Sequence, residues 1–281
     1  MKVASIQMVS TASVDENIAQ ARKLLEQAAA AGAELAVLPE YFCLIGQRDA
    51  DKLAIAETFG AHSNDTESSA PLQTFLSHTA RELGLWIVGG TIPLRANQPD
   101  RVFNSSLVFN PAGECVARYD KIHLFRFNNG RESYDESRVL EAGTQPVRFA
   151  LPSRDGNTWQ IGISVCYDLR FPELFRHYAL GENGMDLLVL SAAFTYTTGQ
   201  AHWEILLRAR AIENLCFVAA SAQGGTHPNG RQTWGQSLLI DPWGAIAAQQ
   251  AQGAGVVCAD LDFARLNAVR TQLPALQHGV L

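Results

Sequence analysis

The chain has 281 residues, of which 47% are hydrophobic and 18% are charged, and its formal net charge is −6. This composition is ordinary for a globular protein and supplies enough apolar residues for a sizeable core, which argues against extensive disorder. The mild acidity and the lack of a basic run argue against nucleic acid or an anionic membrane surface as a partner.

In the first half of the chain, short apolar runs alternate with segments of helical periodicity. Residues 2–8 predict a strand, and a helix is expected to begin at Ser13, where Glu16 completes the pattern of a capping box, and to end at Gly32. Residues 71–83 predict a second helix. The remaining expected elements are strands at 35–38 and 86–91 and a hairpin of strands 106–109 and 114–119.

The second half repeats this order of elements. Strands are expected at 161–165, 187–190 and 216–221, with helices at 173–180 and 200–214 and a hairpin about 241–244. We therefore predict an α/β fold, a four-layer α-β-β-α sandwich of two similar halves that forms a single domain over residues 1–281. Two independent small α/β domains are the alternative, which is disfavoured because no Pro/Gly/Ser-rich linker separates the halves.

The sequence also indicates where the protein works. The first residues read as a strand and lack the features of a signal peptide, and no apolar stretch approaches the roughly 20 residues of a membrane helix. The scattered histidines have no metal-ligand spacing, so no metal site is expected. A reducing, cytoplasmic location is expected because the cysteines are odd in number and widely spaced: Cys43, Cys115, Cys166, Cys216 and Cys258.

Two reactive side chains directly follow predicted strands. Glu40 follows the strand at 35–38, and Cys166 follows the strand at 161–165. In open α/β folds, reactive groups collect beyond the carboxyl ends of strands. Pro172 suits the first turn of a helix, which places Cys166 in a sharp strand-to-helix turn near free backbone N–H groups. Such a turn stabilises a thiolate and can hold an oxyanion, whereas the other cysteines are interpreted as small hydrophobes.

A third candidate is Lys121, at the end of the first hairpin. It lies between apolar neighbours, which indicates that at least its aliphatic stem is buried. Glu40 lies in an apolar run and is expected to be partly buried and to need a partner. No rule of spacing joins Glu40, Lys121 and Cys166 into one site.

At these residues the sequence resembles the nitrilase superfamily of carbon–nitrogen hydrolases. The resemblance extends over essentially the whole chain and rests on five motifs: LPE at 38–40, YDKIHLF at 119–125, CYDLRFPEL at 166–174, GQAHWEILLRARAIEN at 199–214 and DPWG at 241–244. It implies an α-β-β-α sandwich, a Glu–Lys–Cys triad at Glu40, Lys121 and Cys166, and no metal or organic cofactor.

The resemblance also implies a mechanism on a small-molecule amide. Glu40 takes the thiol proton, and Cys166 attacks the carbonyl to form a thioester. Lys121 and the N–H of Tyr167 stabilise the oxyanion. Glu40 protonates the leaving amine and then activates the water that hydrolyses the thioester. Members use a second glutamate, which is assigned here to Glu136.

Several features around this centre stay open. Glu132 is a weaker candidate for the second glutamate, and residues 126–132 depart from the family pattern, which suggests a mobile loop at the mouth of the site. Phe194 and Thr195 lie where a pocket wall is expected and are candidate substrate contacts. The family implies a homodimer, or a higher even oligomer, through helices next to the cysteine.

Within the superfamily, the motifs look most like the deaminated glutathione amidases, which release 2-oxoglutarate and cysteinylglycine. The related ω-amidases, which act on α-ketoglutaramate, or another aliphatic amide or carbamoyl hydrolase, are the alternative. Deaminated glutathione and α-ketoglutaramate both need an anion-binding group in the pocket, for which Arg170 and Arg208 are candidates. Arg208 is interpreted as structural because Glu204 lies four residues before it on a helix.

Two further alternatives remain. The first is a non-catalytic interaction protein. It is disfavoured because such a protein would be free to lose one of the three triad residues, and all three are present. A Cys–His site would use His123 or His202 as the base for Cys166.

Overall fold

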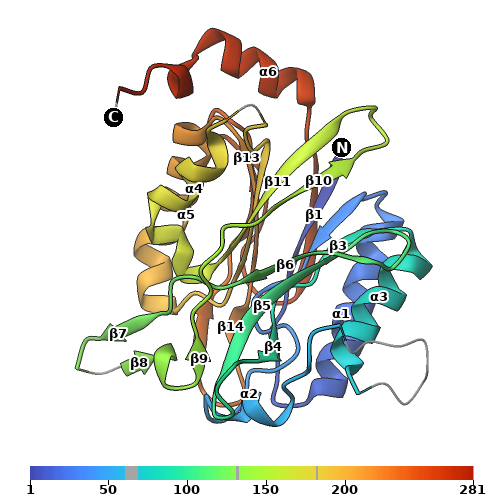
Figure 1. Ribbon diagram of the computed structural model, residues 1–281, viewed down its shortest axis with the longest axis vertical. Helices are drawn as coiled ribbons and strands as arrows, with labels where there is room; N and C mark the ends of the chain where they lie inside the picture. Colours follow the sequence, from blue (N-terminus) through green and yellow to red (C-terminus); the bar gives the residue numbers. More distant parts are fainter. Residues whose placement is uncertain (61–68, 131–132, 182, 281) are drawn as a thin grey trace.

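A computed structural model describes residues 1–60, 69–130, 133–181 and 183–280. Two sheets stack face to face in this structure, and helices cover the outer face of each (Figure 1). Helices α1 (Val14–Ala30) and α3 (Pro71–Leu83) cover the first sheet, and α4 (Pro172–Ala179) and α5 (Tyr196–Asn214) cover the second. This layering confirms the predicted four-layer sandwich.

The first sheet combines parallel strands with antiparallel ones at its flanks. Strands β1, β2 and β3 run parallel, whereas β18 and β5 pair antiparallel on either side. The order of the main path is β18 (Gly255–Asp260), β1 (Lys2–Gln7), β2 (Leu35–Val37), β3 (Trp86–Val88), β5 (Val102–Phe109) and β4 (Ile92–Arg95), and β6 (Cys115–Asp120) and β9 (Leu140–Glu141) also pair with β5.

The second sheet repeats this pattern and confirms the two similar halves. Its parallel strands β11, β12 and β13 are flanked by antiparallel β10 and β16. The order is β10 (Arg148–Pro152), β11 (Thr158–Val165), β12 (Leu187–Ala192), β13 (Phe217–Ala222), β16 (Ser237–Ile240) and β17 (Ile246–Gln250). Because β18 returns from the end of the chain to pair with β1, the halves are interlocked.

One hydrophobic cluster joins the inner faces of both sheets. It includes Val3 and Val37 of the first sheet and Ile163 and Leu187 of the second, all of which are fully buried. Strands β12 and β13 are buried along their whole length, which explains why their sequences are apolar except for one serine in each. The two sheets therefore share one core.

The predicted helix starts are partly right. Ser13 caps α1, since its hydroxyl accepts a hydrogen bond from the N–H of Glu16. The predicted capping box is not completed, because the carboxylate of Glu16 accepts from the hydroxyl of Thr11 at 3.0 Å. Helix α5 begins at Tyr196, four residues before the predicted start at Gln200.

Residues 126–132 were predicted to be a mobile loop at the mouth of the site, and the described part of this segment begins with a strand. β7 (Arg126–Asn128) pairs antiparallel with β8 (Ser133–Asp135) in a short hairpin, and residues 131 and 132 lie outside the described residues. The remaining elements are short or terminal: α2 (Asp51–Ala54), η1 (Glu136–Arg138), η2 (Cys166–Arg170), β14 (Gly224–Thr226), β15 (Gln232–Trp234), α6 (Phe263–Gln272) and η3 (Ala275–Gln277).

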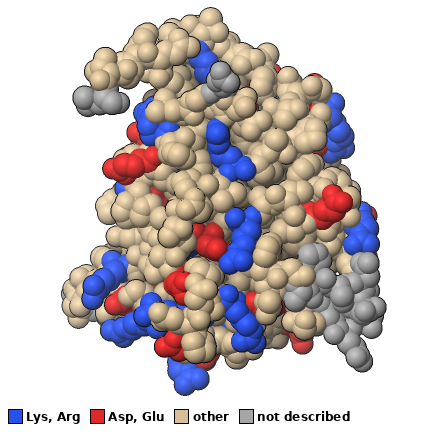
Figure 2. Space-filling view, viewed as in Figure 1, with Lys and Arg blue, Asp and Glu red and all other residues tan. Residues whose placement is uncertain are grey.

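The surface carries charges of both signs. On the face shown in Figure 2, lysine and arginine side chains are interspersed with aspartate and glutamate. Within the described part of the chain, no helix combines the length and apolar character needed to cross a membrane.

Candidate active site

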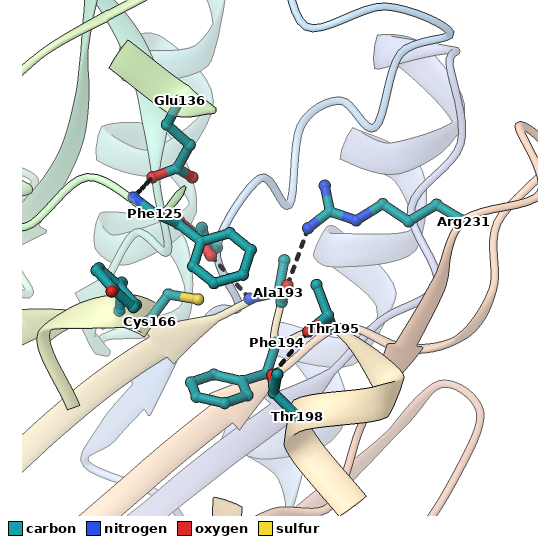
Figure 3. A pocket seen from close by; sticks show the side chains of 10 residues that line it. Phe125, Glu136, Cys166, Ala193, Phe194, Thr195, Thr198 and Arg231 are labelled. Atoms are coloured by element: carbon teal, nitrogen blue, oxygen red, sulfur yellow. Dashed lines mark hydrogen bonds between the residues drawn. The ribbon is translucent and has the colours of Figure 1, made fainter. Parts of the chain in front are cut away.

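Cys166 occupies a strained turn between β11 and α4. Its φ of 48° lies in the left-handed region, which a residue with a side chain occupies at a cost of about 1–3 kcal/mol. The turn is held by Asp168, which is fully buried and accepts a hydrogen bond from the N–H of Val165 at 2.8 Å. This strand-to-helix turn is the one that the sequence predicted, and it points the thiol of Cys166 into a pocket (Figure 3).

Glu40 follows β2 and is buried, with hydrogen bonds to both of its carboxylate oxygens. Oε1 accepts from Lys121 Nζ at 3.0 Å and from Asn104 Nδ2 at 2.9 Å. Oε2 accepts from the N–H of Ala193 at 2.8 Å. Three elements of the two halves therefore hold this carboxylate in one orientation.

Lys121 follows β6 and lies between two carboxylates. Its side chain is 0% exposed, and its Nζ lies 3.0 Å from Glu40 and 2.8 Å from Glu136. Glu136 also accepts from the N–H of Phe125 at 2.7 Å and from the hydroxyl of Tyr41 at 3.0 Å. The structure thus brings Glu40, Lys121 and Glu136 together, although they come from distant parts of the chain.

The charges in this group depend on one another. Burial alone would lower the pKa of Lys121, but the carboxylates of Glu136 and Glu40 raise it, so the ammonium stays charged. Burial acts to raise the pKa of Glu136, and Lys121 outweighs this effect and lowers it. A buried lysine between two carboxylates is therefore a fixed positive charge within the site.

Cys166 is affected in the opposite direction. Burial raises the pKa of its thiol well above the usual range, and Glu40 raises it further, while Lys121 lowers it. The turn therefore does not by itself bring the pKa of this thiol below its ordinary value. The thiol is protonated at rest, and a base must take its proton during the reaction.

The pocket at Cys166 is small. Its volume is about 10 Å³, roughly the space that one water molecule needs. Tyr167, Phe194 and Thr195, the predicted substrate contacts, belong to the lining. The full set of lining residues is Glu40, Phe125, Glu136, Cys166, Tyr167, Ala193, Phe194, Thr195, Thr198 and Arg231.

The predicted anion-binding arginines lie elsewhere. Arg170 is not among the residues that line this pocket; its guanidinium lies 3.3 Å from His202 Nδ1 and above the ring of Phe194. Arg208 pairs with Glu204 at 3.3 Å and donates to the carbonyl of Gly244, which agrees with the structural interpretation.

The arginine that lines the pocket is Arg231, from a segment in which no sequence motif was found. Arg231 precedes β15 and donates from Nη2 to the carbonyl of Ala193 at 3.0 Å (Figure 3). Its position depends on the hairpin of β14 and β15, which carries no motif that points to a site. Asn104 was not singled out for the same reason, and Asp168, although it lies in the CYDLRFPEL motif, was given no role, since only tertiary contacts reveal what these two residues do.

The candidate histidines do not line the pocket. His123 bonds to Asp168 at 2.7 Å and stacks on Phe171 at 3.7 Å, and His202 lies beside Arg170. Glu132 lies outside the described residues. Among the residues that the structure describes, no group of three or more potential ligands is arranged to hold a metal ion.

The chain matches the carbon–nitrogen hydrolase family over residues 2–271, and it belongs to that family. Deaminated glutathione amidase of Synechocystis sp. strain PCC 6803 is 38% identical over 279 residues, which are 99% of this chain and 97% of that protein. A superfamily member from Xanthomonas campestris, solved with an arsenic adduct in its active site, is 31% identical with a TM-score of 0.82; the match covers 100% of this chain and 97% of that one.

A third relative connects this fold with cysteine chemistry. A glutamate-to-glutamine mutant of an amidase from Nesterenkonia sp. AN1 is 25% identical with a TM-score of 0.75, and the match covers 98% of each chain. In that structure, acrylamide has undergone Michael addition at the active site cysteine.

Proposed function

We propose that this carbon–nitrogen hydrolase is an amidase that converts deaminated glutathione to 2-oxoglutarate and cysteinylglycine through a thioester on Cys166. The proposal rests chiefly on one observation: the buried ammonium of Lys121 lies between Glu40 and Glu136 beside a pocket that contains the Cys166 thiol. The Synechocystis relative of 38% identity, named deaminated glutathione amidase, supports the choice of substrate.

In the acylation step, Glu40 takes the proton of the Cys166 thiol while sulfur attacks the amide carbonyl carbon. The carbonyl oxygen becomes an oxyanion, which the ammonium of Lys121 and the N–H of Tyr167 stabilise. The N–H of Tyr167 suits this role because amides in the first turn of a helix lack an intrahelical partner. Glu40 then gives its proton to the nitrogen, the C–N bond breaks, and the amine leaves.

In the deacylation step, Glu40 takes a proton from water and the resulting hydroxide attacks the thioester carbonyl. The C–S bond breaks, the acid leaves, and the sulfur regains a proton from Glu40. The thiol and the carboxylate thus return to their starting states. Neither step needs a metal or an organic cofactor, because Cys166 supplies the nucleophile and Lys121 the positive charge.

Arg231 is suited to bind the acyl part of the substrate. The acyl part of deaminated glutathione ends in a 2-oxo acid, whose carboxylate needs a cation, and Arg231 is the arginine of the pocket lining. Within the described residues, its guanidinium has no carboxylate partner at ion-pair distance. The role first assigned to Arg170 therefore passes to Arg231 in this proposal.

The test is turnover on deaminated glutathione beside α-ketoglutaramate, with the oxoacid and the amine measured separately. We expect a higher kcat/KM for deaminated glutathione and no turnover by Cys166→Ala. A clear preference for α-ketoglutaramate would make the protein an ω-amidase. Undiminished turnover by the Cys166→Ala variant would overturn the mechanism.

Two further expectations belong to this proposal. A cytoplasmic location is supported by five cysteines that are all free thiols. A homodimer through α5 is supported by two exposed isoleucines on that helix, Ile205 and Ile212.

A further inference from the structure

A second cavity, which the mechanism does not use, adjoins the catalytic pocket. Its volume is about 420 Å³, which is within the range of sites that bind small organic ligands. Arg231 belongs to the walls of both cavities. The second one is lined by Tyr41, Leu44, Ile45, Gly46, Gln47, Arg48, Asp49, Lys52, Ser133, Tyr134, Asn229 and Arg231.

The loop that forms much of this cavity is held in place. Asn229 donates from its side chain to the carbonyl of Gly46 at 2.7 Å, and the N–H of Ile45 donates to the carbonyl of Thr11 at 3.0 Å. The hydroxyl of Tyr41 bonds to Glu136 of the catalytic group. The cavity is therefore a built extension of the active site.

The walls of this cavity favour an anion. Three of its residues are cations, namely Arg48, Lys52 and Arg231, and one, Asp49, is a carboxylate. The overall charge of the chain is −6, so this local excess of positive charge runs against the composition. An acidic protein that concentrates cations in one cavity attracts anionic ligands to it.

Lys52 is the cation best placed to bind a ligand here. Its side chain is only 13% exposed, and its ammonium lies 4.5 Å from the centre of the Tyr41 ring. Its carboxylate partner is Asp49, at 3.3 Å, and that side chain is 59% exposed. Ion pairs of this length with an exposed carboxylate are weak, so the ammonium can turn to a ligand.

Arg48 and Arg231 are less available at this end. Arg48 is exposed and pairs with Asp51 at 3.3 Å. Arg231 donates to Ala193 at the catalytic pocket, and its guanidinium lies 5.6 Å from the centre of the Tyr134 ring. Arg231 therefore faces the acyl side, whereas Lys52 holds the far side of the cavity.

We propose that this second cavity binds the leaving amine of the substrate and that Lys52 pairs with a carboxylate on that amine. The inference rests on the proposed amidase function and gives a place to the part of the substrate that the small catalytic pocket cannot hold. The substrate class is an amide whose leaving amine ends in a carboxylate, such as a short peptide. An amide that releases ammonia leaves this cavity empty.

The test compares two substrates that share an acyl group. Deaminated glutathione releases cysteinylglycine, and α-ketoglutaramate releases ammonia. For Lys52→Met, we expect the ratio of kcat/KM for deaminated glutathione to that for α-ketoglutaramate to fall at least about tenfold, since a charge-assisted bond is lost. Lys52→Arg keeps the charge and should restore much of the ratio, and Lys23→Met, on the exposed face of α1, should leave the ratio unchanged.

A modified substrate gives an independent measurement. Deaminated glutathione with a C-terminal carboxamide lacks the carboxylate, so the wild type should lose about as much kcat/KM on it as Lys52→Met loses on the natural acid. Lys52→Met should then show little further loss on the carboxamide. If Lys52→Met lowers kcat/KM equally on deaminated glutathione and on α-ketoglutaramate, the cavity does not bind the leaving amine. If the wild type hydrolyses neither of these two substrates, the proposed function itself fails.

Discussion

The hydroxyl of Tyr119 donates to Asp168 across 2.6 Å and joins the element that carries Lys121 to the turn that carries Cys166. Tyr119 lies on β6 of the first sheet, two residues before Lys121, and Asp168 lies two residues after Cys166. Both residues are fully buried. This bond fixes the two halves of the sandwich relative to each other at the point where the reaction is proposed to occur.

Removing this hydroxyl should affect both stability and catalysis. In Tyr119→Phe, Asp168 keeps its bonds to Val165 and His123 but loses its link to β6. We expect the free energy of unfolding to fall by about 1–3 kcal/mol and kcat/KM to fall clearly, as measured by urea denaturation and by initial rates.

A matched variant separates the two effects. Tyr178 is also a buried tyrosine, and its hydroxyl donates to the carbonyl of Ile163 at 2.9 Å and accepts from the N–H of Val147 at 3.0 Å. Tyr178→Phe should lower stability by a similar amount and leave kcat/KM close to that of the wild type. Equal losses of kcat/KM in both variants would show that Tyr119 acts through general stability alone.

Glu40→Gln should abolish turnover and yet make Cys166 more acidic. Glu40 is the proposed base, so its loss should lower kcat by at least about 10²-fold. Because the negative charge of Glu40 raises the pKa of the Cys166 thiol, the pKa should fall in this variant. The pH dependence of alkylation by iodoacetamide measures the pKa, and release of 2-oxoglutarate measures turnover.

The same experiment addresses a Cys–His mechanism. His202 lies beside Arg170 and outside the pocket lining, so His202→Gln should retain turnover. A Glu40→Gln variant that keeps most of its activity, together with an inactive His202→Gln, would favour a histidine base. A thiol pKa that rises in Glu40→Gln would contradict the electrostatic account of Cys166.

Much of the framework could be predicted from the sequence because its signals are local. The run at 187–190 is apolar throughout, as a strand buried on both faces must be. Pro71 and Gly84 bound α3, where proline begins a helix and glycine ends it in a left-handed conformation. The turn at Cys166 was also predictable, from the strand before it and Pro172 after it.

The remaining parts of the site depend on long-range contacts that no local pattern encodes. Asn104 and Arg231 contact the centre only because β5 and the β14–β15 hairpin fold onto it. The raised pKa of the Cys166 thiol could not be predicted either, since burial outweighs the favourable turn. Arg170 was a reasonable candidate by sequence, but its side chain lies beside His202 and Phe194.

An exposed apolar stripe on α5 leads to a prediction about assembly. Ile205 is 70% exposed, and Ile212, also exposed, lies seven residues later on the same face of the helix. Exposed apolar groups of this kind mark interfaces, so Ile205→Asp should shift the protein from dimer to monomer in sedimentation velocity. Val280→Asp, at an exposed site near the chain end, should not. A wild type that sediments as a monomer would refute the dimer.

Acid should destabilise the fold through His227. Burial lowers the pKa of this histidine below its ordinary value of 6.5. Its Nδ1 lies 2.9 Å from the carbonyl of Ser10, and its Nε2 lies 2.8 Å from the hydroxyl of Thr233. A neutral ring satisfies both contacts, since Nδ1–H donates to the carbonyl and Nε2 accepts from the hydroxyl. Protonation would remove the acceptor.

The sign of the pH effect follows from linkage. Well above pH 6.5 the ring is neutral in both the folded and unfolded states, so it costs no stability. As the pH falls below 6.5, the unfolded chain binds a proton that the folded chain excludes, and the free energy of unfolding decreases. Urea denaturation between pH 7.5 and 5.5 should therefore give a steeper loss of stability for the wild type than for His227→Asn. His278→Gln, at an exposed histidine, should follow the wild type; equal slopes for His227→Asn and the wild type would mean that His227 does not control the acid sensitivity of the fold.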